Sequence, residues 1–137
     1  MSIRMKFKLP RKNLLLDDRR NPYDLFLRDL NLTYEHNDDF DVVKSYTEFI
    51  RYINFYGIPK GIISLDGDLD YYHYLPENQI GKIDYDSYEV KCGMHALMWL
   101  RLFCDKRNIQ PPKILFHTSN QVMKKDMVEF YNEWIKS

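Results

Sequence analysis

The sequence predicts an α/β fold, in which a doubly wound parallel sheet of about four strands forms a single domain. Three observations support this prediction. Short apolar runs alternate along the chain with segments of helical periodicity, as expected when helices join parallel strands. The runs are apolar without interruption, which is typical of strands buried on both faces. The 137 residues are 45% hydrophobic, so we expect one domain over residues 1–137, with residues 1–12 as a loose N-terminal extension.

The first two strands are expected at residues 13–18 and 40–46. "NLLLDD" (13–18) is an apolar run that ends in two acids, and "RRNPYD" then breaks it. "FDVVKSY" (40–46) has the β-branched and aromatic content of a strand. Between them, "LFLRDLNLTYEH" (25–36) is either a short helix or an irregular excursion.

A helix and a third strand follow. Apolar residues recur near the helical period in "YTEFIRYINFYG" (46–57), which predicts a helix with Thr47 as its N-cap and Gly57 as its stop. "KGIISLD" (60–66) is continuous and apolar, as in a strand covered on both faces.

The second half of the chain contains a long loop, a helix, a strand and a terminal helix. Residues 71–90 are rich in Tyr and Asp and have little periodicity; a loop of this length in a compact domain is often functional. "GMHALMWLRLFCDKRN" (93–108) is a helix, and "PPKILFHTSN" (111–120) is the fourth strand with its polar end. The terminal helix has apolar residues at helical spacing, namely Met123, Met127, Phe130, Tyr131 and Trp134.

Charge and cysteine content restrict the classes of function. Twenty basic and twenty acidic residues cancel, so contact with nucleic acid would need a local basic patch. Cys92 and Cys104 are twelve residues apart, at the start of and within one helical stretch, roughly 18 Å along its axis, which is too far for a disulfide bond. Free thiols, the absence of a signal-peptide pattern and the absence of an apolar membrane span predict a cytoplasmic protein. Abundant Lys, Asn and Tyr are typical of a low-GC bacterial or phage genome.

Polar groups that can perform chemistry follow three of the four strands. In an open parallel sheet, ligands bind outside the carboxyl ends of the strands, where the strand order reverses. With the flavodoxin-like order 2-1-3-4, that point lies between the first and third strands. Two acidic pairs are expected to face each other across it, Asp17 and Asp18 after the first strand and Asp66 and Asp68 after the third; the fourth strand ends in His117, Thr118, Ser119 and Asn120.

Carboxylates that converge at one sheet edge repel one another unless a cation lies between them. We therefore predict a Mg²⁺ or Mn²⁺ ion held by Asp17, Asp18, Asp66 and Asp68. Such an ion can polarise a phosphoryl oxygen or activate a water, and His117 can move a proton near neutral pH. Acids and glycine after a strand are also common turn material, so a structural role stays open for each motif taken singly. The remaining histidines have no ligand spacing and are expected to be surface or packing residues, namely His36, His73 and His95.

Taken together, four polar segments resemble the cyclic-phosphate processing receiver-like domains of bacteria and their viruses, a branch of the receiver fold. That family carries the patterns L-D-D-x-R-x-P, S-[LF]-D-H-D-L, K-T-G opening a helix, and H-S-x-N-P-x-G before the last helix. The matching segments here are "LDDRRNP" (16–22), "SLDGDL" (64–69), "KCG" (91–93) and "HTSNQVM" (117–123). The resemblance covers nearly the whole chain from residue 13, and its combined pattern is more specific than any one segment.

The resemblance implies an acidic site that processes cyclic phosphates. By this likeness His117, Asp66 and Asp68 are candidate catalytic residues. The phosphate-binding candidates are Arg20, Lys91, Thr118 and Asn120.

The chain departs from the family pattern at several positions. Gly67 replaces the histidine between the two aspartates, which removes a candidate acid, base or phosphate donor. Gln121 and Met123 replace a proline and a glycine, and the glycine position can require close approach of the backbone to a ligand. Cys92 and Thr118 are milder changes, from threonine and serine.

Three functions remain open. The first is a metal-dependent phosphoesterase that acts on a cyclic-phosphate nucleotide or on an RNA end. The second is a catalytically reduced binding or interaction protein, for example a phage-encoded one; the Tyr-rich loop could stack on a base. The third is a phosphoacceptor signalling domain with Asp66 as acceptor, although the fifth strand and lysine of ordinary receivers are not found after the last helix. The sequence decides neither the protein partner nor the oligomeric state.

Overall fold

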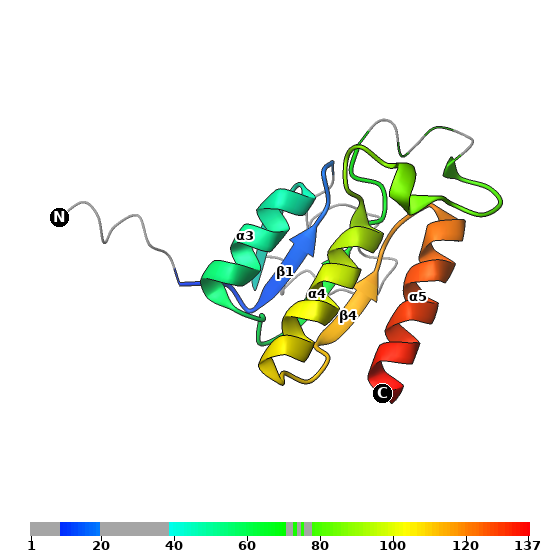
Figure 1. Cartoon of the computed structure of the whole chain (residues 1–137). Helices are drawn as coiled ribbons and strands as arrows, with labels where there is room; N and C mark the ends of the chain where they lie inside the picture. The colour runs from blue at the N-terminus through cyan, green and yellow to red at the C-terminus, as the bar shows by residue number, and fades with distance from the viewer. Residues whose placement is uncertain (1–8, 20–38, 71–72, 74, 76–77) are drawn as a thin grey trace.

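The computed structural model describes residues 9–19, 39–70, 73, 75 and 78–137 (Figure 1). Four parallel strands form one sheet in the order β2-β1-β3-β4. Their bounds are β1 Asn13–Leu16, β2 Phe40–Val43, β3 Ile62–Leu65 and β4 Lys113–Phe116. The order and the parallel pairing confirm the predicted fold class, with each strand shorter than the segment predicted for it.

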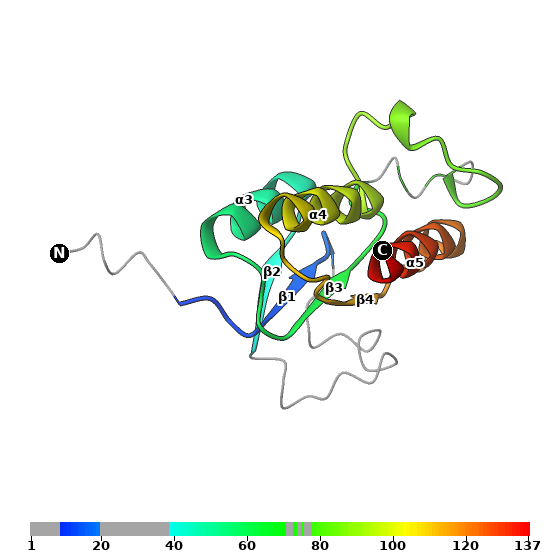
Figure 2. The same cartoon turned by 60° about the horizontal axis from the view of Figure 1, so that its bottom comes forward.

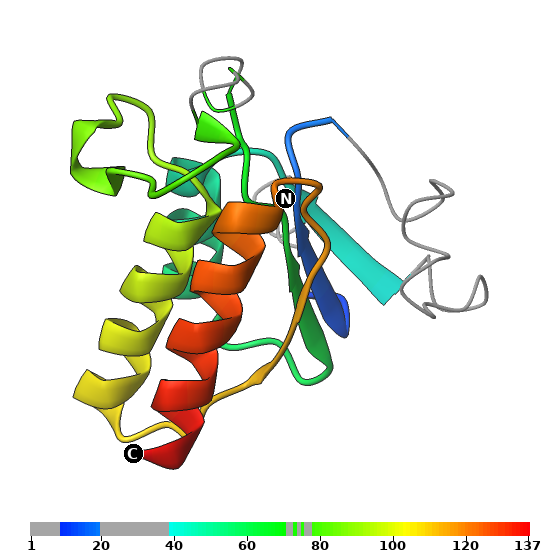
Figure 3. The same cartoon turned by 90° about the vertical axis from the view of Figure 1, so that its right-hand side faces the viewer.

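Three α-helices and one short 3-10 helix complete the described part of the chain. They are α3 (Tyr46–Tyr56), η4 (Tyr85–Ser87), α4 (Gly93–Arg107) and α5 (Gln121–Lys136). Figures 2 and 3 show α3, α4 and α5 on the same face of the sheet, with α4 between the other two. Residues 25–36, predicted as a short helix or an excursion, lie outside the described residues. Among the helices that are described, none has the length and apolar character needed to cross a membrane.

The main core lies between the sheet and these helices. Strand side chains alternate between the two faces, so one set from β1 and β3 meets the helices, namely Leu14, Leu16, Ile63 and Leu65. Leu97, Leu100 and Cys104 of α4 are fully buried in this core, at the helical spacing of one apolar face. The intervening residues of the strands, such as Leu15 and Phe40, form a second cluster on the opposite face.

The N-terminus of α3 corrects one prediction. Its N-cap is Ser45 and not Thr47: the Ser45 hydroxyl accepts a hydrogen bond from the Glu48 N–H at 3.1 Å. An N-cap needs an extended backbone, which Ser45 has with φ −148°, whereas Thr47 is already in the first helical turn and exposed. Gly57 ends the helix as predicted, with φ 84° and its N–H bonded to the Ile53 carbonyl at 2.8 Å.

This cap assignment predicts different effects for two neighbouring substitutions. Ser45→Ala is expected to lower the free energy of unfolding by about 1 kcal/mol, because the Glu48 N–H loses its acceptor. Thr47→Ala is the matched control and is expected to change it by less than about 0.5 kcal/mol. Urea unfolding followed by circular dichroism measures both; a larger loss for Thr47→Ala would show that the cap is misassigned.

Candidate active site

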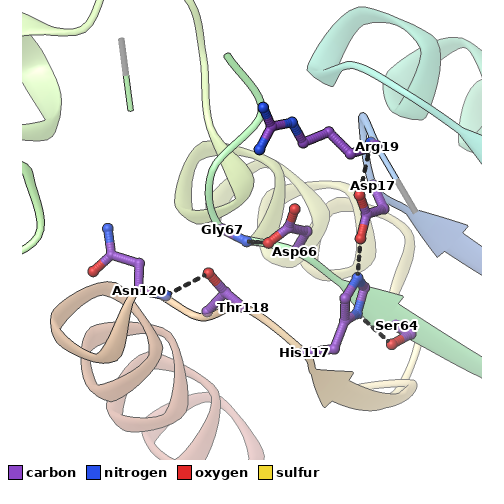
Figure 4. A network of polar contacts seen from close by, with 8 residues as sticks. All are labelled: Asp17, Arg19, Ser64, Asp66, Gly67, His117, Thr118 and Asn120. Atoms are coloured by element: carbon purple, nitrogen blue, oxygen red, sulfur yellow. Dashed lines mark hydrogen bonds and ion pairs between the residues drawn. The ribbon is translucent and has the colours of Figure 1, made fainter. Parts of the chain in front are cut away.

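Three polar side chains meet where β1, β3 and β4 end. Asp17, Asp66 and His117 are each the first residue after their strand, and each still donates its backbone N–H to the neighbouring strand. These three hydrogen bonds measure 2.9–3.0 Å, to the carbonyls of Val43, Leu16 and Leu65 in turn. The sheet therefore fixes the backbone of all three residues, and their side chains point toward one another (Figure 4).

Asp17, Asp66 and His117 form a compact, buried cluster. One potential ligand atom from each lies within 4.8 Å of the others, and the three side chains are at most 2% exposed. His117 Nε2 is 2.9 Å from Asp17 Oδ2, and Asp66 Oδ1 accepts a hydrogen bond from the Gly67 N–H at 2.8 Å. The predicted convergence of the first and third strand ends is thus present, and the end of β4 joins it.

Ser64 is part of this network and was not among the predicted site residues. Its hydroxyl lies 2.7 Å from His117 Nδ1, and the side chain is fully buried in the middle of β3. Two signals in the sequence mark it: it opens the segment "SLDGDL" of the family resemblance, and it is a polar residue inside the apolar run "GIISLD". The contact between Ser64 and His117 depends on the pairing of β3 with β4. In this pairing Ser64 is opposite Leu115, close to the strand end that carries His117.

Asp68 is also buried but has different partners. Its carboxylate accepts hydrogen bonds from Asn120 Nδ2 at 3.2 Å and from Gln79 Nε2 at 3.0 Å. Asn120 is the N-cap of α5, and its Nδ2 also donates to the Asn78 carbonyl at 2.8 Å. Asp68 therefore joins the long loop to the start of α5, and it is not a member of the compact cluster.

The other predicted site residues have varied positions. Thr118 is buried, and its Oγ1 accepts the Asn120 N–H at 3.1 Å. Asp18 is half-buried and outside the compact cluster, while Lys91 is exposed just before α4. Arg20 lies outside the described residues. The neighbouring Arg19, which was not predicted, donates its backbone N–H to Asp17 Oδ1 at 2.8 Å (Figure 4).

Two histidines hold the long loop against the domain, in agreement with the packing role predicted for them. His73 Nδ1 accepts the Leu69 N–H at 2.8 Å, and its Nε2 is 2.7 Å from the Val90 carbonyl. His95 Nδ1 likewise accepts the Cys92 N–H at 3.0 Å, and its Nε2 is 3.0 Å from the Tyr85 carbonyl. A backbone N–H can only donate and a carbonyl can only accept, so both rings fit as neutral imidazoles with the proton on Nε2. His36 lies outside the described residues.

The loop contacts predict a pH dependence of stability. Burial lowers the pKa of His95 from its ordinary 6.5, so below that pH the unfolded chain takes up a proton that the folded chain resists. The contribution of His95 is therefore fully present above pH 6.5 and is lost as the pH falls below it. We expect His95→Gln to show a smaller loss of unfolding free energy between about pH 7.5 and pH 5.5 than wild type, measured by urea unfolding. Equal losses in the two proteins would show that His95 is not the responsible group.

Gly67 has little space for a side chain. The family resemblance predicts a histidine at this position. A Cβ at this position would lie 2.6 Å from Met123 Sδ and 2.9 Å from Thr118 Oγ1. Met123 is fully buried and replaces the family's glycine. The two departures from the family pattern are therefore spatially linked, because the methionine side chain occupies space that a side chain at position 67 would need.

The donor set fits a divalent cation. Asp17 and Asp66 offer carboxylate oxygens, which Mg²⁺ and Mn²⁺ prefer, and His117 offers a nitrogen that Mn²⁺ accepts more readily than Mg²⁺ does. Two buried carboxylates this close together repel each other when ionised, and a cation between them removes that repulsion. The cluster could thus bind a metal ion.

Comparison with known proteins supplies one match. The sequence profile of a family described as the cyclic-phosphate processing Receiver domain matches residues 12–133. Neither the curated proteins nor the solved structures include a significant match to the chain.

Proposed function

The chain belongs to the family of cyclic-phosphate processing receiver domains, and from this premise we propose that it is a metal-dependent phosphoesterase. Its substrate would be a cyclic phosphate on a nucleotide or at an RNA end. The observation that carries the proposal is the buried cluster of Asp17, Asp66 and His117 at the carboxyl edge of the sheet. Ligands of open parallel sheets bind at this edge.

In this proposal the two acids hold a divalent cation, Mg²⁺ or Mn²⁺. The bound cation would polarise a phosphoryl oxygen and supply an activated water. Asp17 and Asp66 would ligate it through carboxylate oxygens that the ends of β1 and β3 hold in place. Both carboxylates also receive backbone N–H groups, which keep them oriented.

The phosphate would bind at the start of α5. A helix N-terminus carries partial positive charge and unsatisfied N–H groups, which favour an anion. Asn120 caps this helix by accepting the Met123 N–H at 3.0 Å, and Thr118 precedes it. Lys91 and Arg20 are the proposed additional phosphate-binding cations. A proton-transfer role for His117 remains a prediction from the sequence.

A second function is binding of the cyclic phosphate without turnover. It is favoured by Gly67, where the chain lacks the side chain that the family resemblance predicts and where Met123 and Thr118 fill the adjacent space. A protein of this kind would sequester a nucleotide or an RNA end. Both functions fit a cytoplasmic location, because Cys92 and Cys104 are free, buried thiols.

Calorimetric titration with Mg²⁺ and Mn²⁺ tests the proposal. Wild type is expected to bind a divalent cation, and Asp66→Asn is expected to weaken binding at least about tenfold. Asp68→Asn is the matched control: Asp68 is equally buried and two residues away, but it bonds to Asn120 and Gln79, so its variant should keep most of the metal affinity.

The metal-loaded protein is then incubated with 2′,3′-cyclic nucleotides and with an RNA oligonucleotide ending in a cyclic phosphate. Ring-opened product seen by chromatography supports the phosphoesterase, and binding without product supports sequestration. If neither metal nor nucleotide binds, the proposal fails. A mass increase by one phosphoryl group after treatment with acetyl phosphate and Mg²⁺ would instead identify a phosphoacceptor domain.

A further inference from the structure

Ser64, His117 and Asp17 form a continuous hydrogen-bonded chain across three strands. Ser64 Oγ lies 2.7 Å from His117 Nδ1, and His117 Nε2 lies 2.9 Å from Asp17 Oδ2. All three side chains are 0% exposed. Figure 4 shows the imidazole ring between the hydroxyl and the carboxylate, with one ring nitrogen toward each.

The hydrogen-bonding capacity of the three groups determines the direction of the chain. An ionised carboxylate only accepts, so when Asp17 is ionised His117 Nε2 carries a proton and donates a hydrogen bond to Asp17 Oδ2, 2.9 Å away. In a neutral imidazole the other nitrogen is then an acceptor, and the Ser64 hydroxyl donates to it. The chain runs from Ser64 O–H to Nδ1 and from Nε2–H to Asp17.

This arrangement differs from what a metal ligand or a proton shuttle needs. A ligating imidazole must present a lone pair to the metal, but His117 Nε2 faces the Asp17 carboxylate at 2.9 Å and donates to it when that carboxylate is ionised. A proton shuttle must reach the substrate, but this ring is fully buried, with the Ser64 hydroxyl on one side and the Asp17 carboxylate on the other. A carboxylate has about four acceptor positions, so Asp17 can receive both Nε2–H and the Arg19 N–H and still ligate a cation.

We propose that Ser64 and His117 are positioning residues that orient the ionised Asp17 carboxylate toward the cation, and that His117 is not itself a ligand. This inference rests on the proposed cation site and adds the residues that prepare it. Hydrogen-bond partners of metal ligands typically contribute a 10- to 100-fold factor to metal affinity. The proposal also favours Mg²⁺ over Mn²⁺, because without His117 the protein ligands are oxygens only.

The first test concerns the metal-free protein and does not depend on any metal or substrate. In a long-range ¹H–¹⁵N correlation spectrum of the imidazole groups at about pH 8, His117 is expected to carry its proton on Nε2 and none on Nδ1. The His117 signals are assigned by their loss in His117→Gln. A proton on Nδ1 overturns the proposed chain. After Mg²⁺ is added, the proton should stay on Nε2; its loss would identify His117 as a ligand.

The second test compares Mg²⁺ affinities by calorimetry. Ser64→Ala and His117→Ala are each expected to weaken binding about 10- to 100-fold. His117→Gln should retain most of the affinity, because the glutamine amide can donate to Asp17 in place of Nε2–H. An equal loss in His117→Gln and His117→Ala overturns the positioning role.

A control separates affinity from stability. Ile63→Val changes the residue next to Ser64, also fully buried, and is expected to lower the urea concentration at the unfolding midpoint without changing Mg²⁺ affinity. A matching loss of affinity in Ile63→Val would overturn the inference. If wild type binds no Mg²⁺, both the proposed function and the positioning role fail, while the metal-free imidazole spectrum still reports whether the hydrogen-bonded chain exists.

Discussion

Gly93→Ala is expected to lower the free energy of unfolding by about 3 kcal/mol, a large part of the stability of a small domain. Gly93 begins α4, and a Cβ there would lie 1.9 Å from the Asp66 carbonyl oxygen and 2.9 Å from Gly67 Cα. These atoms are backbone at the end of the central strand β3, so no rotamer change relieves the contact. Either the start of α4 or the Asp66–Gly67 segment must move.

The same contact connects the helix to the site. The Gly93 N–H donates to the Gly67 carbonyl at 2.7 Å, which fixes the segment immediately after Asp66. We therefore expect Gly93→Ala also to weaken metal binding, although its side chain would touch no ligand atom. Urea unfolding and Mg²⁺ calorimetry on one preparation measure the two effects.

Gly81→Ala is the control for this prediction. Gly81 has φ +70° with nothing within 4 Å of its Cβ position, so alanine there introduces backbone strain without a clash. That strain is expected to cost about 1–2 kcal/mol and to leave metal affinity unchanged. If Gly81→Ala destabilises as much as Gly93→Ala, the close approach of α4 to the strand end is not the cause.

Gly67→Ala is expected to cost about 1–3 kcal/mol, and most of that cost should disappear in the Met123→Ala background. The added Cβ would meet Met123 Sδ at 2.6 Å, and removing the methionine side chain relieves that contact. Contacting residues typically show coupling energies of about 0.5–3 kcal/mol in a double-mutant cycle. Part of the cost should remain, because Thr118 Oγ1 lies 2.9 Å from the same position and accepts the Asn120 N–H.

The Met123→Ala variant of this double-mutant cycle also allows a test of activity. Gly67→His in the Met123→Ala background returns a histidine to the position where the family resemblance predicts one. If the wild-type protein binds a cyclic phosphate without hydrolysing it, turnover in this double variant would identify the lost histidine as the cause. A coupling energy near zero would show that the Met123 side chain is not what restricts a side chain at position 67.

The local pattern of the chain was sufficient for the elements and the fold class. Apolar runs and helical periodicity are local properties, and they identified all four strands and the three described α-helices. The N-cap of α3 was placed two residues late, because Ser45 and Thr47 are equally suitable residue types and only the backbone conformation distinguishes them. The cluster was predicted in part: Asp17, Asp66 and His117 follow from the rule that parallel strands end at one edge.

The partners within the site depended on the tertiary structure. Asp66 and Asp68 both follow the third strand, which is why the sequence predicts that they act together at its carboxyl end. The strand ends at Leu65, however, and the Gly93 N–H at the start of α4 donates to the Gly67 carbonyl. As a result Asp66 lies beside Asp17 and His117. Asp68 instead accepts hydrogen bonds from Asn120 and Gln79. The contact of Ser64 with His117 likewise depends on the tertiary structure. The serine opens the segment "SLDGDL" of the family resemblance, but only the pairing of β3 with β4 shows that its hydroxyl lies against the His117 ring.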